Sequence, residues 1–84
     1  MGDFVFEPWE LEQENDKMVS VFRWGERKCD NGEVHRIMVT LYLGKGDNPT
    51  YLEIYDDASM NFLQVDCKDL PDLLNKMESH LAWY

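Results

Sequence analysis

The segment EVHRIMVTLYL, residues 33–43, constrains the fold of this chain more than any other. From residue 37 onward its odd-numbered positions are all large aliphatic side chains: Ile37, Val39, Leu41 and Leu43. Only an extended strand turns every second residue to one face. The even-numbered positions are half apolar as well: Val34, Met38 and Tyr42. A strand with this pattern is typical of the middle of a sheet that has material against both faces.

Other segments with the same period predict an antiparallel meander of four or five strands. They are residues 4–11, 18–24, 50–55 and 61–67. Pro8 has no backbone N–H to donate, so the first segment is expected to be a bulged edge strand. The polar run ELEQENDK, residues 10–17, is interpreted as a turn, and residues 25–32 as a polar excursion. That excursion ends in Asn31-Gly32, which favours a tight hairpin turn.

After Cys67 the period changes to that of an amphipathic helix, expected over about residues 70–82. Its apolar stripe is Leu70, Leu73, Leu74, Met77 and Leu81. Asp69 is a favourable N-cap, and Pro71 is tolerated in a first turn. The stripe is expected to cover the aliphatic face of the sheet. The prediction is therefore a single α+β domain over residues 1–84, with one C-terminal helix packed on one face of the meander.

Strand parity places a second set of large side chains on the face away from that helix. The set is Phe22, Trp24, Met38, Tyr42, Tyr51, Tyr55 and Phe62. Large bare apolar patches are rare on monomers, so we expect residues 4–11 or Trp83-Tyr84 to cover it at least in part. The alternative is a dimer or partner surface, because Tyr and Trp are favoured at interfaces. Under that alternative the binding residues are Trp24, Tyr42, Tyr51, Tyr55 and Phe62.

The chain is strongly acidic, with 17 Asp and Glu against 8 Lys and Arg and a net charge of −9. Such a field repels phosphate backbones and anionic membranes and attracts basic protein surfaces. The candidate acidic binding residues are Glu7, Glu10, Glu12, Glu14 and Asp16, extended by Asp47, Asp56 and Asp57 in predicted turns. The alternative is that these charges serve solubility alone.

No catalytic, metal or cofactor motif is present, and we expect neither an enzyme nor a metal or cofactor site. The soft metal ligands are Cys29, Cys67, His35 and His80, and their spacing matches no zinc motif. Without a secretory signal the two cysteines are expected to be reduced. No stretch reaches the length of a membrane span. We therefore expect a cytoplasmic protein that does not enter a membrane.

One cluster is basic and aromatic: Arg23, Trp24, Arg27, Lys28 and Arg36. Such a cluster is able to stack and hold a single-stranded nucleic acid. The strand, cap and helix of residues 61–81, which contain FLQVDCKDLPDLLNKMESHL, are similar in layout to PC4-like and YdbC-like single-strand-binding proteins. That resemblance implies nucleic-acid binding and a helix that helps to form a dimer. Those families carry a lysine-rich face that this chain lacks, so direct nucleic-acid binding is not the function we expect.

The function we expect is that of a small acidic protein-binding or inhibitor module that engages a basic surface. In composition the chain resembles immunity proteins and phage-encoded anti-CRISPR or anti-restriction proteins, which block nucleic-acid-handling enzymes. Two alternatives remain. One is a single-stranded nucleic-acid module built on the basic cluster, and the other is a structural subunit that forms a homodimer through its aromatic face.

Overall fold

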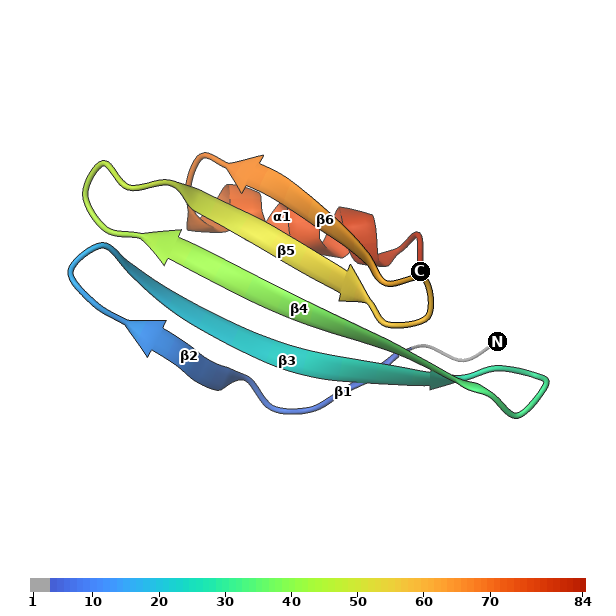
Figure 1. Ribbon diagram of the computed structural model, residues 1–84. Helices are drawn as coiled ribbons and strands as arrows, with labels where there is room; N and C mark the ends of the chain where they lie inside the picture. The colour runs from blue at the N-terminus through green and yellow to red at the C-terminus, as the bar shows by residue number, and fades with distance from the viewer. Residues whose placement is uncertain (1–3) are drawn as a thin grey trace.

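The computed structural model describes residues 4–84, which form one six-stranded antiparallel sheet and one helix (Figure 1). The elements are β1 (Val5–Phe6), β2 (Glu10–Glu14), β3 (Met18–Lys28), β4 (Val34–Gly44), β5 (Thr50–Asp56), β6 (Asn61–Cys67) and α1 (Leu70–Leu81). The order across the sheet is β1-β3-β4-β5-β6, and β2 also pairs with β3. The predicted α+β class, antiparallel meander and C-terminal helix are confirmed.

The N-terminal edge of the sheet differs from the prediction. It consists of two short strands, β1 and β2, separated at Pro8, and both pair with β3. Residues 10–14 are therefore a strand and not part of a turn. All five side chains of β2 are exposed and four of them are polar, as suits an edge strand that contributes mainly backbone pairing. The bulge lies between Leu11 and Gln13, later than the position expected from Pro8.

The hairpin between β3 and β4 is longer than the prediction, because β3 continues past Trp24 to Lys28. Residues 25–28 pair in register with residues 34–37, so most of the predicted polar excursion is strand. The turn itself lies at Asn31-Gly32, as the sequence predicted. Gly32 has a φ of 86°, and its amide donates to the Cys29 carbonyl at 3.0 Å.

The core lies between the sheet and α1, and it is built from the odd-numbered side chains of β4 and the even-numbered ones of β5. The fully or almost fully buried apolar residues are Ile37, Val39, Leu41, Leu52, Ile54 and Leu73. The predicted helix stripe is only partly correct, because Leu70 and Leu74 remain 47% and 42% exposed. Helix α1 contacts β5 and β6 chiefly, and of its stripe only Leu73 is fully buried.

The helix begins where the sequence predicted it and ends within one residue of the expected position. The Asp69 carboxylate accepts a hydrogen bond from the Asp72 amide at 2.9 Å, which is an N-cap. The Asp72 carboxylate in turn accepts from the Lys68 amide and pairs with Lys76. These contacts hold the pKa of Asp72 below its ordinary value, with the Lys68 hydrogen bond as the largest cause.

Both ends of the described chain pack on the helix side of the sheet. Phe4 and Tyr84 lie against the His35 ring, at centroid distances of 5.3 and 6.5 Å. The Phe6 ring lies over Gly25, where an added Cβ atom would stand only 2.5 Å from the ring. The expectation that one of these ends covers the opposite face is therefore wrong. Within residues 4–84 no element lies over that face (Figure 1).

Candidate functional site: the open face of the sheet

The face of the sheet that points away from α1, called the open face below, is organised in three rows that cross four strands. Directly paired residues of antiparallel strands place their side chains on the same face, so the rows follow from the register. The first row is Trp24, Met38, Tyr55 and Phe62; the second is Phe22, Thr40, Glu53 and Gln64; the third is Ser20, Tyr42, Tyr51 and Asp66.

The first row is apolar from end to end. The Tyr55 and Phe62 rings contact each other at a centroid distance of 4.8 Å, and Phe62 is 69% exposed. At the opposite end the Arg36 guanidinium lies over the Trp24 ring, 4.5 Å from its centroid. Arg36 also forms an ion pair with Glu26 at 3.1 Å. An arginine is thus already held on this face by one aromatic ring and one carboxylate.

The third row joins stacked tyrosines to carboxylates. Tyr42 and Tyr51 stack at 4.3 Å with 15° between their planes. The Tyr42 hydroxyl donates to the Glu53 carboxylate at 3.2 Å, and the Ser20 hydroxyl donates to Glu12 at 3.0 Å. Burial, followed by the charges of Glu53 and Glu12, raises the pKa of both tyrosines. Both tyrosines therefore remain neutral beside carboxylates, and the Tyr42 hydroxyl stays a hydrogen-bond donor.

This arrangement is suited to binding cationic side chains. Aromatic faces attract guanidinium and ammonium groups through their quadrupoles, and carboxylates supply ion pairs with Arg and Lys. The Arg36, Trp24 and Glu26 contacts show both interactions on the same surface. The open face can hold a basic and partly apolar partner surface by the same means.

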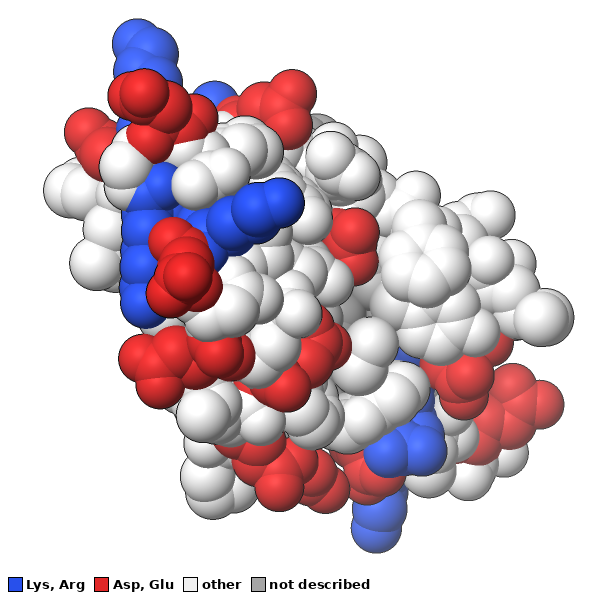
Figure 2. Space-filling view, turned by 60° about the vertical axis from the view of Figure 1, so that its left-hand side comes forward, with Lys and Arg blue, Asp and Glu red and all other residues white. Residues whose placement is uncertain are grey.

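Some of the sequence-predicted acids lie at this face and others do not. Glu10 pairs with Phe22, and Glu12 reaches Ser20, so both border the open face along β2. Glu14 pairs with Val19 and falls on the helix side. The remaining exposed acids lie near the edge or in turns: Glu7, Asp16, Asp47 and Asp57. Figure 2 shows acidic side chains in several separate groups on one side of the molecule, with uncharged surface between them.

Asp56 belongs to a separate polar contact on the helix side. Its carboxylate lies 2.9 Å from Nε2 of His35, whose Nδ1 is 3.2 Å from Nη2 of Arg27. Partial burial acts to raise the pKa of Asp56, but the hydrogen bonds from His35 and from the Ala58 amide outweigh it and lower the pKa. Asp56 is therefore engaged within the fold and does not extend the acidic surface.

The predicted basic cluster is divided between the two faces. Arg23 and Arg27 lie on the helix side, over the Phe6 and Trp9 rings and over the Phe4 ring respectively. Trp24 and Arg36 lie on the open face, and Lys28 lies at the exposed end of β3. The five residues do not form one surface.

Besides Glu26, which pairs with Arg36, two further open-face carboxylates, Glu53 and Asp66, were not predicted from the sequence. A signal for both was present. Glu53 stands between Tyr51 and Tyr55 with the same parity, and Asp66 shares the parity of Phe62. Neither acid lies in a dense acidic run or in a predicted turn, the places where the acidic binding residues were expected.

A hollow of about 360 Å³ lies at the C-terminal end of α1. It is lined by Phe4, Phe6, Arg27, Glu78, Leu81, Ala82 and Tyr84.

Among residues 4–84 no group of three or more His, Cys, Asp or Glu side chains converges as a metal site would require. In the same part of the chain, no helix combines the length and apolar character needed to cross a bilayer.

Comparison with known proteins gave no relative: no protein-family model, curated protein or solved structure matches this chain.

Proposed function

We propose that this chain is a small protein-binding module that engages a basic surface of a partner through the open face of its sheet. The observation that carries the proposal is the combination on one uncovered face of aromatic rows with the carboxylates of Glu10, Glu12, Glu53 and Asp66. A patch kept only for solubility needs charge but no ordered aromatic rows, which would make the surface less soluble.

The partner class follows from the chemistry of the face and the charge of the chain. A net charge of −9 steers basic surfaces toward the molecule and repels free nucleic acid. Basic grooves lined with aromatic side chains are typical of proteins that bind single-stranded nucleic acids, and we infer that the partner is a nucleic-acid-handling enzyme that this protein inhibits by covering such a groove. The proposal places it in the cytoplasm, in keeping with the free cysteines Cys29 and Cys67.

The test compares two variants with the same change in charge. In the first, Glu10, Glu12 and Glu53 of the open face become Gln; in the second, the off-face acids Glu14, Asp47 and Asp57 become Gln, Asn and Asn. An arginine-rich peptide serves as a defined probe, titrated against each protein and followed by two-dimensional NMR. We expect wild-type shifts to concentrate at Trp24, Tyr42, Tyr51 and Tyr55, and only the first variant to bind at least about fivefold more weakly.

If both variants bind the peptide equally weakly, the loss of affinity is due to net charge alone, and the proposed role of the open face is overturned. A single-stranded oligonucleotide titrated in the same way tests the nucleic-acid alternative. Shifts at the same residues with the oligonucleotide, strengthening as salt is lowered, would replace the proposed function with that alternative.

A further inference from the structure

The two edges of the sheet differ in how far they are protected against pairing with another strand. The β1–β2 edge is interrupted at Pro8, bulged between Leu11 and Gln13, and rich in acids. Proline, bulges and charged side chains are devices by which natural sheets block edge pairing. Strand β6 at the other edge has no proline and no bulge. It pairs with β5 without interruption from Asn61 to Cys67, and its one charged residue is Asp66.

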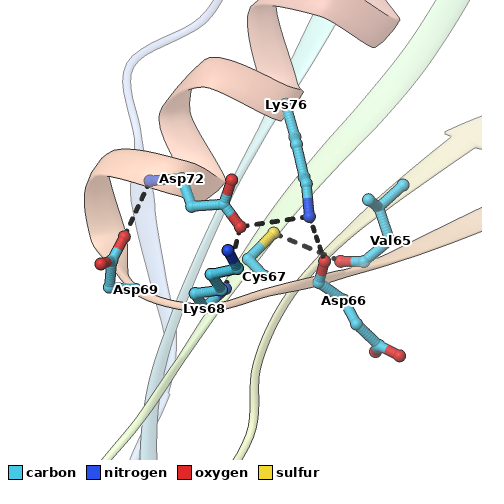
Figure 3. Close-up of polar contacts among 7 residues, drawn as sticks. All are labelled: Val65, Asp66, Cys67, Lys68, Asp69, Asp72 and Lys76. Carbon is cyan, nitrogen blue, oxygen red and sulfur yellow. Dashed lines mark hydrogen bonds and ion pairs between the residues drawn. The ribbon is translucent and has the colours of Figure 1, made fainter.

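The ladder fixes which backbone groups of β6 point outward. The Asp57 amide donates to the Arg36 carbonyl, so the odd-numbered residues of β5 direct their backbone groups toward β4 and the even-numbered ones toward β6. The even-numbered residues of β5 pair with odd-numbered residues of β6. The backbone groups of Phe62, Gln64 and Asp66 therefore point away from β5. The Asp66 carbonyl accepts from Lys76 Nζ at 2.8 Å, as Figure 3 shows. Within residues 4–84 the outward N–H groups of Phe62 and Gln64 donate no hydrogen bond and their carbonyls accept none.

We propose that β6 is the site at which a second copy of this chain adds its own β6, antiparallel and related by a two-fold axis. Phe62 then stands opposite Gln64 of the second copy, and each such pair exchanges both backbone hydrogen bonds. Leu63 meets Leu63 of the second copy on the helix side. The bond from Lys76 to Asp66 stays intact, because this register uses only the outward groups of Phe62 and Gln64.

The sequence of β6 suits a second copy. Residues 61–65 carry no charge, so this register places no like charges opposite each other. The two Asp66 carboxylates stand at opposite ends of the paired segment. Phe62, now 69% exposed, gains a neighbour on the open face, and the open faces of the two copies join into one continuous surface. The net charge of −9 on each copy opposes association over longer distances, so added salt strengthens the dimer.

The experiment is sedimentation equilibrium of the full chain over a concentration series at low and high salt, with Gln64→Pro as the main variant. The Gln64 amide points away from β5, so a proline there leaves the internal ladder intact and removes the intermolecular donor. Asp66→Pro is the matched control, since its amide also points outward but lies outside the proposed pairs. Phe62→Lys is a second variant that leaves the backbone unchanged and sets a charge on the edge.

We expect a reversible dimer in the wild type and in Asp66→Pro, stronger at high salt, with Gln64→Pro and Phe62→Lys at least about tenfold weaker. The amide protons of Phe62 and Gln64 exchange more slowly as concentration rises. Circular dichroism verifies that each variant is folded. A wild-type monomer at all concentrations and both salts would overturn the proposal, as would a dimer that Gln64→Pro and Phe62→Lys leave unchanged. Dimerisation strengthens with added salt and depends on Phe62 and Gln64. Binding of the basic peptide weakens with salt and depends on Glu10, Glu12 and Glu53. Failure of one proposal is therefore distinguishable from failure of the other.

Discussion

The two faces of the sheet are both rich in large apolar side chains, but only one of them is packed. On the helix side, Ile37, Leu52 and Ile54 are completely buried in one core cluster with Leu73 of α1. On the open face Tyr42, Tyr51 and Tyr55 are only partly buried, and Phe62 is mostly exposed. The same strands supply both faces, so the difference arises from what lies above the sheet and not from the strands themselves.

The composition of each face matches its surroundings. The packed face is aliphatic, and aliphatic side chains have no polar atoms to satisfy when they are buried. The open face uses tyrosine and tryptophan, which bury area and keep a polar atom in contact with water. Stability is therefore expected to depend mainly on the helix side and binding on the open face.

The largest expected effect compares two core positions on the packed side, one in β4 and one in α1, with an exposed position of the same helix. Leu73→Asp and Leu41→Asp place an unpaired charge in the core and should abolish cooperative unfolding. Leu74→Asp, one position along the helix from Leu73, should unfold cooperatively because Leu74 is 42% exposed. Thermal unfolding followed by circular dichroism measures all three. If Leu74→Asp also fails to fold, the half-covered helix stripe described above is incorrect.

A smaller effect compares one residue from each face. Leu52→Ala removes a fully buried side chain and should lower the free energy of unfolding by about 2–5 kcal/mol. Trp24→Ala removes a larger side chain from the open face, yet it should cost only about 1–2 kcal/mol, including the lost contact with Arg36. Urea unfolding measures both. A cost for Trp24→Ala equal to that of Leu52→Ala would show that the open face is structural.

The smallest expected effect concerns pH and the His35–Asp56 contact on the helix side. The pKa of Asp56 is lower in the folded protein than in the unfolded chain, so its contribution is present above the unfolded value of about 4. It is lost as the pH falls through the folded value. Asp56→Asn should therefore make the acid loss of stability shallower than in the wild type, whereas the neighbouring exposed Asp57→Asn should not. Urea unfolding from about pH 5 downward tests this; identical slopes for both variants would contradict it.

Much of the fold could be predicted because local patterns determine it. The alternation of Ile37, Val39 and Leu41 placed the core face, and Asp69 marked the start of the helix. Strand β2 could not be predicted, because an edge strand with both faces exposed to solvent shows no alternation of apolar and polar residues. The exposure of Leu70 and Leu74 was also hidden, since helical periodicity identifies a stripe but does not show how much sheet lies beneath it.

The candidate site was predicted in part. Parity assigned Trp24, Tyr42 and Tyr55 to one face correctly, but it could not tell whether that face is covered. Coverage depends on where the chain ends pack, and those contacts join residues far apart in sequence. The contact of Phe4 with His35 is an example, because neither residue shows its partner in its own neighbourhood.

The absence of a side chain at Gly25 has a consequence for the opposite side of the sheet. An alanine at this position would have to displace the Phe6 ring, and a branched residue would fill the space that the ring occupies. The space above Gly25 thus accommodates the Phe6 ring, which holds the N-terminal segment on the helix side and packs against the core cluster. One glycine on the packed face helps to decide which face of the molecule is left free to meet a partner.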